Sequence, residues 1–145
     1  FANDGVLQPV SLLALEGDIP AGKRVISQDT AAQVLKILHA VTDDEGTARK
    51  ARVPGYQVGG KTGTVHKVGT GGYEANKYIA LFAGIAPINH PRIVTVVVIN
   101  EPKGALYGGG AVAAPIFSEM TGATLRILNV PVPRFDPEDE WFDPE

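Results

Sequence analysis

The sequence predicts an α+β domain in which an antiparallel sheet packs against flanking helices. Residues 28–41 repeat apolar side chains at helical spacing, whereas residues 56–67, 76–86 and 92–99 have the composition of three successive strands. The connections between these strands are about five residues long, which is too short for a parallel crossover. The strands are therefore expected to form an antiparallel meander.

The residues before the helix give weaker signals. Residues 1–5 resemble the end of a helix whose start is missing, with Gly5 as a left-handed cap. We therefore expect the chain to be part of a longer protein. Pro9 favours an edge strand or an extended loop for the residues after this cap, and residues 24–26 read as a short strand.

The helix expected over residues 28–41 has a start signal and an apolar face. Ser27 is suited to be its N-cap, and Asp29 lies in the first turn, where the helix dipole favours an acid. The polar residues 42–46 end the helix. Its apolar face is expected to consist of Ala31, Val34, Leu35, Leu38 and Val41.

The C-terminal half predicts a central strand, a loop and a second helix. Residues 93–99 are apolar on both faces, so we expect this strand at the centre of the sheet, covered on both sides. A glycine-rich loop, 104–110, precedes a helix that has Pro115 in its first turn. The expected apolar face of this helix contains Val112, Ile116, Met120 and Leu128.

We divide the chain into residues 1–130, which form the folded unit, and an acidic, proline-rich tail over residues 131–145. The tail holds the acids Asp136, Glu138, Asp139, Glu140, Asp143 and Glu145.

Composition excludes several classes of function. The formal net charge of −3 argues against a nucleic-acid binder, and the absence of cysteine excludes disulfides and thiolate metal sites. No apolar run approaches the ~20 residues that span a bilayer. His39, His66 and His90 have no partner at metal-binding spacing, and the acids at 43–45 lack the regular alternation of a calcium loop. We expect no metal and no cofactor.

Residues 55–64, Gly-Tyr-Gln-Val-Gly-Gly-Lys-Thr-Gly-Thr, fit two unrelated patterns. Gly55 to Thr62 match the phosphate-binding loop of nucleotide hydrolases, which requires a buried strand before it and a helix after it. The preceding residues 49–54 are basic and end in proline, and the glycines at 69–72 disfavour a helix. The nucleotide interpretation is therefore disfavoured.

The second pattern is Lys-Thr-Gly-Thr on a strand that faces a serine-acylation site. Alternation along a strand places the hydroxyls of Thr62 and Thr64 on one face, where both can bind a substrate carboxylate. Lys61 then points to the other side, where its charge favours a deprotonated nucleophile. Gly63 leaves room for a substrate backbone, and the backbone N–H of Thr64 can serve as an oxyanion donor.

Several landmarks in order along residues 1–131 support the second pattern. They are Ala2-Asn-Asp-Gly5, Gly46-Thr-Ala48, Gly60-Lys-Thr-Gly-Thr64, Asn76-Lys-Tyr-Ile79, Phe82-Ala-Gly-Ile-Ala-Pro87, Pro91-Arg92, Asn100-Glu-Pro102, Tyr107-Gly-Gly109 and Ala114-Pro-Ile-Phe117. Through these landmarks the chain resembles the class B penicillin-binding proteins, most closely the septal peptidoglycan transpeptidase of Gram-negative bacteria.

The resemblance implies a penicillin-binding, β-lactamase-like transpeptidase fold and a D,D-transpeptidase that cross-links peptidoglycan stem peptides through an acyl-enzyme. It implies Lys61 and Thr64 as catalytic residues, and Thr62, Gly63, Thr64 and Tyr107 as substrate-binding residues. β-Lactam antibiotics, the N-terminal part of the same protein and divisome proteins are the implied partners. The implied location is the periplasmic side of the inner membrane, with the anchor outside this chain.

The chain departs from the family pattern because it contains neither a Ser-x-x-Lys nor a Ser-x-Asn motif. Ser11, Ser27 and Ser118 open neither of them, so we expect the nucleophile upstream. A D,D-carboxypeptidase or a serine β-lactamase shares the lysine motif. A non-catalytic module that senses β-lactams or binds peptidoglycan stays a further alternative.

Overall fold

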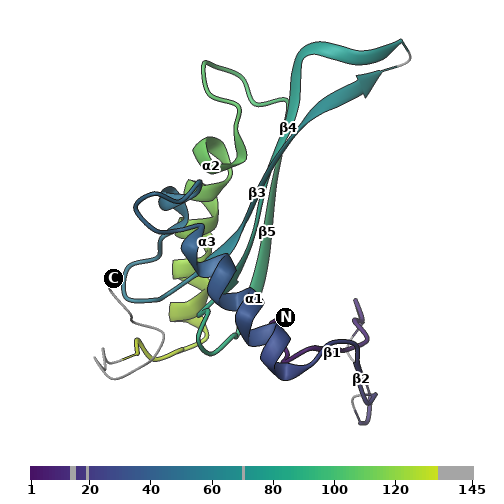
Figure 1. Ribbon diagram of the computed structural model, residues 1–145, viewed down its shortest axis with the longest axis vertical. Helices are drawn as coiled ribbons and strands as arrows, with labels where there is room; N and C mark the ends of the chain where they lie inside the picture. The colour runs from purple at the N-terminus through teal and green to yellow at the C-terminus, as the bar shows by residue number, and fades with distance from the viewer. Residues whose placement is uncertain (14–15, 19, 70, 134–145) are drawn as a thin grey trace.

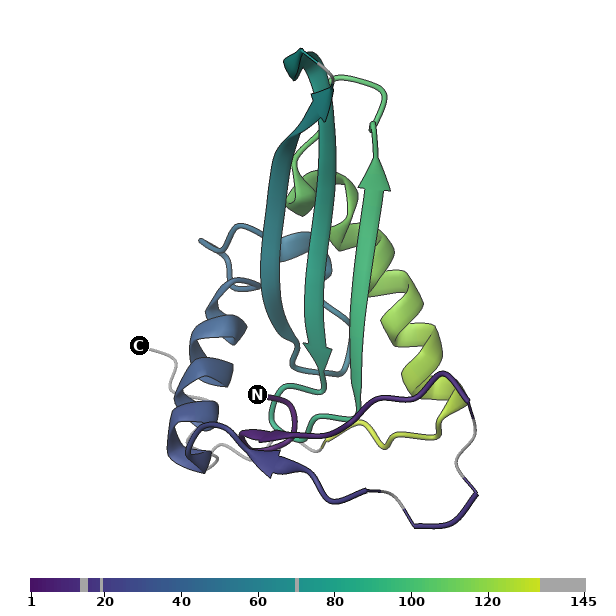
Figure 2. The same cartoon turned by 90° about the vertical axis from the view of Figure 1, so that its right-hand side faces the viewer.

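The structure is a computed structural model that describes residues 1–13, 16–18, 20–69 and 71–133. Figure 1 shows the sheet nearly edge-on, with the helices on one side of it, and Figure 2 shows that α1 lies beside β3 while α3 passes behind β5. The elements are β1 (Val6–Leu7), β2 (Lys23–Arg24), α1 (Gln28–Ala40), the 3-10 helix η1 (Arg49–Ala51), β3 (Gly59–Gly69), β4 (Gly72–Ala86), β5 (Ile93–Asn100), α2 (Gly109–Val112) and α3 (Ala114–Ile127).

The predicted first helix is confirmed as α1. The hydroxyl of Ser27 accepts a hydrogen bond from the backbone N–H of Thr30 at 3.0 Å, as expected of an N-cap. Ala31 and Leu35 are buried and form the contact face of the helix. Because the helix packs against β3 (Figure 2), it fixes the position of the strand that carries residues 61–64.

The antiparallel meander is also confirmed. β3, β4 and β5 are hydrogen-bonded neighbours in chain order, and both pairings are antiparallel. The sequence places a loop at residues 68–72, but β3 continues to Gly69 and β4 begins at Gly72. Pairing within the long hairpin outweighs the weak strand preference of glycine at these positions.

The expectation that the valine-rich strand lies at the centre of the sheet is wrong for the described residues. β4 is the middle strand and β5 lies at an edge. Val97 is buried against the helices, but Val94, Val96 and Val98 on the opposite face are 57–61% exposed. An apolar run on both faces indicates two covered faces, and the described residues cover only one.

The apolar face predicted for the C-terminal helix is also wrong. α3 buries Ala114, Phe117, Thr121 and Leu125, whereas Met120 is 52% exposed. The ring of Phe117 packs edge-on against that of Phe82 on β4, with centroids 4.8 Å apart. The buried face contains small and polar residues, so the spacing of large apolar side chains predicts a different face.

The N-terminal residues form a hydrogen-bonded turn. Gly5 has a φ of +80°, which confirms its left-handed conformation. β1 and β2 pair as a two-stranded arm, and the apolar Val10 and Leu12 beside it are exposed. Of the tail assigned to residues 131–145, positions 134–145 lie outside the described residues. Within the described part of the chain, no helix has the length and apolar character that crossing a membrane requires.

Candidate active site

Residues 61–64 lie on β3, at an edge of the sheet. β3 pairs with β4, and no other strand of the described chain lies along its outer edge. An edge strand has backbone groups free to pair with an extended peptide. Thr62 lies inside the strand and does not begin a helix, so the nucleotide-binding interpretation of the motif is wrong.

The hydroxyls of Thr62 and Thr64 lie on the same face of β3, as alternation predicts. The backbone N–H of Gly109, at the start of α2, donates to Oγ1 of Thr64 at 3.0 Å. Oγ1 of Thr62 lies 3.5 Å from Oγ1 of Thr47. Both hydroxyls therefore face the first turn of α2 and the loop before η1.

Glycines allow α2 to approach β3 this closely. A Cβ atom at Gly109 would lie 2.2 Å from the carbonyl oxygen of Leu81, and one at Gly110 would lie 2.1 Å from that of Thr47. Backbone atoms cannot give way at such distances. Gly109 and Gly110 are therefore a steric requirement of the close approach of α2 to the sheet and to the loop before η1.

Lys61 lies on the opposite face of β3 from the two hydroxyls. In the sheet it is in register with Ala83 on β4 and, through Ala83, with Val96 on β5. Its Nζ donates to the backbone carbonyl of Thr62 at 2.9 Å, and the side chain is exposed. The ammonium group therefore belongs to the face of the sheet that the described residues leave open. Gly63 shares this face, where a Cβ atom would meet the side chain of Leu81 at 2.8 Å.

Tyr107 lies in a set of stacked rings near Thr64. Its ring stacks on Tyr78 of β4 with centroids 4.0 Å apart and an interplanar angle of 13°. Tyr78 is opposite His66 in the sheet, and these two rings are 4.4 Å apart. Tyr78 belongs to the landmark at residues 76–79 but has no role assigned from the sequence, because only the cross-strand register brings it to His66 and only the fold brings it to Tyr107.

Two groups near this stack have shifted pKa values. Burial, followed by the neighbouring Tyr107, raises the pKa of Tyr78 above its ordinary value. The pKa of Glu101 is lowered, first by its hydrogen bond to Lys67 and then by the charge of that lysine. The Lys67–Glu101 ion pair thus joins β3 to the residue that follows β5.

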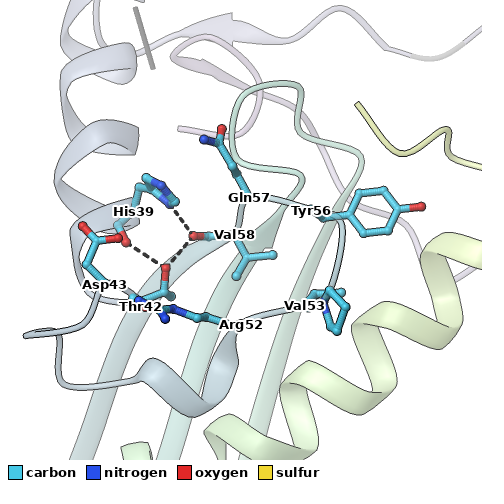
Figure 3. Close-up of a pocket in the computed structure, with 9 residues that line it drawn as sticks. His39, Thr42, Asp43, Arg52, Val53, Tyr56, Gln57 and Val58 are labelled. Carbon is cyan, nitrogen blue, oxygen red and sulfur yellow. Dashed lines mark hydrogen bonds between the residues drawn. The ribbon is translucent and has the colours of Figure 1, made fainter. Parts of the chain in front are cut away.

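A cavity of about 410 Å³ lies between the end of α1 and the start of β3 (Figure 3). On its wall, Nδ1 of His39 lies 2.8 Å from the carbonyl oxygen of Val58, and the hydroxyl of Thr42 donates to the same oxygen at 3.0 Å. Arg52 donates through Nε to the carbonyl of Thr42 at 2.6 Å. These bonds hold the chain immediately before β3, so the sequence analysis, which gave His39 no role, missed a structural one.

The three serines of the sequence lie within the described residues, and their hydrogen bonds are to groups other than Lys61. Ser27 caps α1, and the hydroxyl of Ser11 donates to the carbonyl of Leu13. The hydroxyl of Ser118 donates to the carbonyl of Arg52. All three serines of the sequence are therefore engaged with nearby backbone. Within the described residues the candidate site brings together a lysine, two threonine hydroxyls and a tyrosine, but no serine.

The edge strand thus carries Lys61-Thr-Gly-Thr64 with two hydroxyls on one face and the lysine on the other. Residues 1–122 match the family model of the penicillin binding protein transpeptidase domain. The chain therefore belongs to this family, which confirms both the resemblance to class B penicillin-binding proteins and the predicted fold class.

Individual relatives agree with this assignment. The probable peptidoglycan D,D-transpeptidase PenA of Neisseria meningitidis is 42% identical over 130 residues, which cover 90% of this chain and 22% of the relative. The peptidoglycan D,D-transpeptidase FtsI of Escherichia coli is 40% identical over 126 residues, which cover 87% of this chain and 21% of the relative. The apo transpeptidase domain of Burkholderia pseudomallei penicillin-binding protein 3 aligns with a TM-score of 0.82 at 44% identity.

The chain spans only part of these proteins. It covers about a fifth of the two curated relatives and 41% of the Burkholderia chain, while 92% of this chain is aligned to that structure.

Proposed function

We propose that this chain is part of a peptidoglycan D,D-transpeptidase that cross-links stem peptides through a serine acyl-enzyme. The observation that supports this most directly is the motif on β3, where the hydroxyls of Thr62 and Thr64 share one face and Lys61 occupies the other. The family assignment and the names of PenA and FtsI point to the same activity. The nucleophilic serine lies outside this chain.

In this proposal the threonine hydroxyls bind the terminal carboxylate of the stem peptide. Oγ1 of Thr64 already accepts a hydrogen bond from Gly109, so its own proton is available to donate to a carboxylate. The hydroxyl of Thr62 lies on the same face and supplies a second donor. Hydrogen bonds to a charged group are worth about 1.5–3 kcal/mol each, which makes this pair the main determinant of substrate orientation in the chain.

Lys61 and the backbone of Thr64 act on the chemical step. The ammonium group of Lys61 favours the deprotonated form of the serine, whose oxygen attacks the carbonyl carbon of the penultimate D-alanine. The backbone N–H of Thr64 stabilises the oxyanion. The bond to the terminal D-alanine then breaks, and the departing amine takes a proton. An amine of a second stem peptide attacks the resulting ester, which forms the cross-link and restores the serine hydroxyl.

The open face of the sheet is proposed to pack against the remainder of the transpeptidase domain. This face carries Lys61 together with Val94, Val96 and Val98, which are 57–61% exposed. A contiguous apolar face of this kind marks an interaction surface. Because the ammonium group lies on the same face, the element that covers the valines is also placed to bring the nucleophile to Lys61.

The more specific parts of the proposal rest on the family resemblance. β-Lactams acylate the same serine, in keeping with the penicillin-binding name of the Burkholderia protein. The protein acts in septal cell-wall synthesis with divisome partners, on the periplasmic side of the inner membrane.

The test is the rate at which fluorescent penicillin labels the full-length protein. Lys61→Ala should slow acylation by roughly 100-fold or more, the range found for groups that assist proton transfer. Lys50→Ala removes an exposed lysine of η1 and is the matched control. Melting temperatures check folding.

Equal acylation rates for Lys61→Ala and wild type would remove Lys61 from the active site. The non-catalytic alternative is tested on the wild-type protein: acylation without any cross-linked product from stem-peptide donors would support a sensor.

A further inference from the structure

Lysine side chains gather near the end of the sheet where β3 turns back into β4. Lys67 on β3 forms an ion pair with Glu101, the residue that follows β5. The pKa of Glu101 is lowered first by Lys67 and then also by the charges of Lys77 on β4 and of Lys103. We call Lys67, Lys77 and Lys103 the lysine cluster. It places three positive charges around one carboxylate, in a chain whose net charge is −3.

Backbone pairing brings the lysine cluster together. The register between β3 and β4 shifts around Lys67. Lys77 precedes Tyr78 on β4, and the backbone N–H of Glu101 donates to the carbonyl of Tyr78 at 2.9 Å. Lys103 follows Glu101 by two residues. Lys77 and Lys103 are exposed, whereas Lys67 is half-buried. The sheet and the ion pair therefore fix the position of the cluster, and two of its ammonium groups lie at the surface.

The lysine cluster lies on the path expected for the rest of the peptide substrate. In the proposed function, the terminal carboxylate of the stem peptide binds at Thr62 and Thr64. An extended peptide at the outer edge of β3 pairs most stably when it is antiparallel to the strand. The residues before the terminal dipeptide then run from Thr64 towards Lys67. Three residues of strand span about 10 Å, which the next residue of the peptide and its side chain can reach.

We propose that the lysine cluster is a subsite for a carboxylate that the stem peptide carries before its terminal D-alanines, and that it makes the protein prefer acidic donor peptides. The inference rests on the proposed transpeptidase function. Lys67 is engaged by Glu101, so Lys77 and Lys103 supply the charge that attracts the ligand. The terminal carboxylate is bound by the threonine hydroxyls, so the cluster acts on a different part of the substrate.

The test compares two synthetic peptides that end in D-Ala-D-Ala. They differ at the residue before this dipeptide, which carries a side-chain carboxylate in one peptide and the matching amide in the other. Each peptide competes with fluorescent penicillin for the full-length protein, and the measured quantity is the ratio of the two inhibition constants. Wild type should favour the carboxylate about two- to tenfold at low salt, as expected for exposed ion pairs.

Substitutions of the exposed lysines should remove this preference in steps. Lys77→Gln and Lys103→Gln should each reduce the ratio about 1.5- to 5-fold, and the double variant should bind both peptides equally. The constant for the amide peptide should stay within about twofold of wild type in every variant. Lys50→Gln removes an exposed lysine of η1 and is the matched control, so it should keep the wild-type ratio. Salt at 1 M, where the Debye length is about 3 Å, should abolish the wild-type preference.

The other outcomes overturn the inference. Equal affinity of wild type for the two peptides, competition by neither peptide, or a preference that survives in the double variant would each do so. Weaker binding of both peptides together with a lower melting temperature in the double variant would show a general structural role instead. If wild type is acylated by fluorescent penicillin and Lys61→Ala is impaired, these results refute the inference alone. If wild type is not acylated, the proposed function fails and the inference fails with it.

Discussion

The hydroxyl of Thr64 is expected to have two separable roles, one in stability and one in substrate binding. It accepts the hydrogen bond of the Gly109 N–H at 3.0 Å, and Gly109 is buried. Thr64→Val puts a methyl group where the acceptor stood, which leaves this N–H unsatisfied and blocks water from reaching it. An unsatisfied buried donor costs about 1–3 kcal/mol.

Thr62→Val is the comparison that isolates the stability effect. Its Oγ1 lies 3.5 Å from the hydroxyl of Thr47, at the limit of a hydrogen bond, so its loss should cost less than about 1 kcal/mol in stability. In the proposed function each variant loses one hydrogen bond to the substrate carboxylate, so each should bind substrate roughly 10- to 100-fold more weakly. The two variants should therefore differ in unfolding and agree in affinity.

Calorimetry of the full-length protein measures the stability of each variant, and the Kd for fluorescent penicillin measures its binding affinity. Each kcal/mol shifts the melting temperature by about 2–4 °C for a domain of 150–250 residues and by less for a larger domain, so Thr64→Val should melt measurably below Thr62→Val. Thr64→Ser keeps the hydroxyl and should melt close to wild type. Equal melting temperatures for the two valine variants would refute the anchoring role of the Gly109 hydrogen bond.

Two further outcomes follow from the structure. Because Lys67 holds the pKa of Glu101 below its ordinary value, the pair stabilises the fold above the pKa of an unfolded glutamate, about 4.3, and this contribution is lost as pH falls through the folded pKa. Glu101→Gln should accordingly melt below wild type at pH 7, and the gap should close in titrations to below about pH 4; a gap that persists in acid would contradict this. Val96→Asp, in the open face, should destabilise the full-length protein by several kcal/mol if that face is covered. Val68→Asp, near the hairpin end, should not. Equal free energies of unfolding for the two variants would argue that the face is free.

Local signals in the sequence were sufficient for the elements whose hydrogen bonds are local. Ser27 caps α1 where its side chain predicts, and the short connections require the antiparallel order of β3, β4 and β5. The same local signals failed for α3, because its buried face contains Ala114 and Thr121. Whether such residues are buried depends on the shape of the facing sheet. The spacing of apolar residues along the helix does not predict it.

In the candidate site, too, some residues can be placed from local signals in the sequence and others cannot. Alternation alone places Thr62 and Thr64 on one face and Lys61 on the other, since the period of a strand is two residues. Tyr78 could not be found from its neighbours in sequence, because its partners come from the adjacent strand and from a loop that follows β5. The register shift between His66 and Val68 means that counting back from the hairpin turn does not place Tyr78 opposite His66.

The backbone of the proposed motif is anchored at both ends by residues of this chain. Val58, three residues before Lys61, is held by His39 and Thr42 at the end of α1. Thr64, at the other end of the motif, is held by Gly109 at the start of α2. Both anchors lie on or beside the helix-covered face, so they fix the backbone of residues 61–64 and leave the face of Lys61 unobstructed. A serine brought to that face from the remainder of the domain would meet a lysine whose strand is already in place, which lowers the entropic cost of assembling the reacting groups.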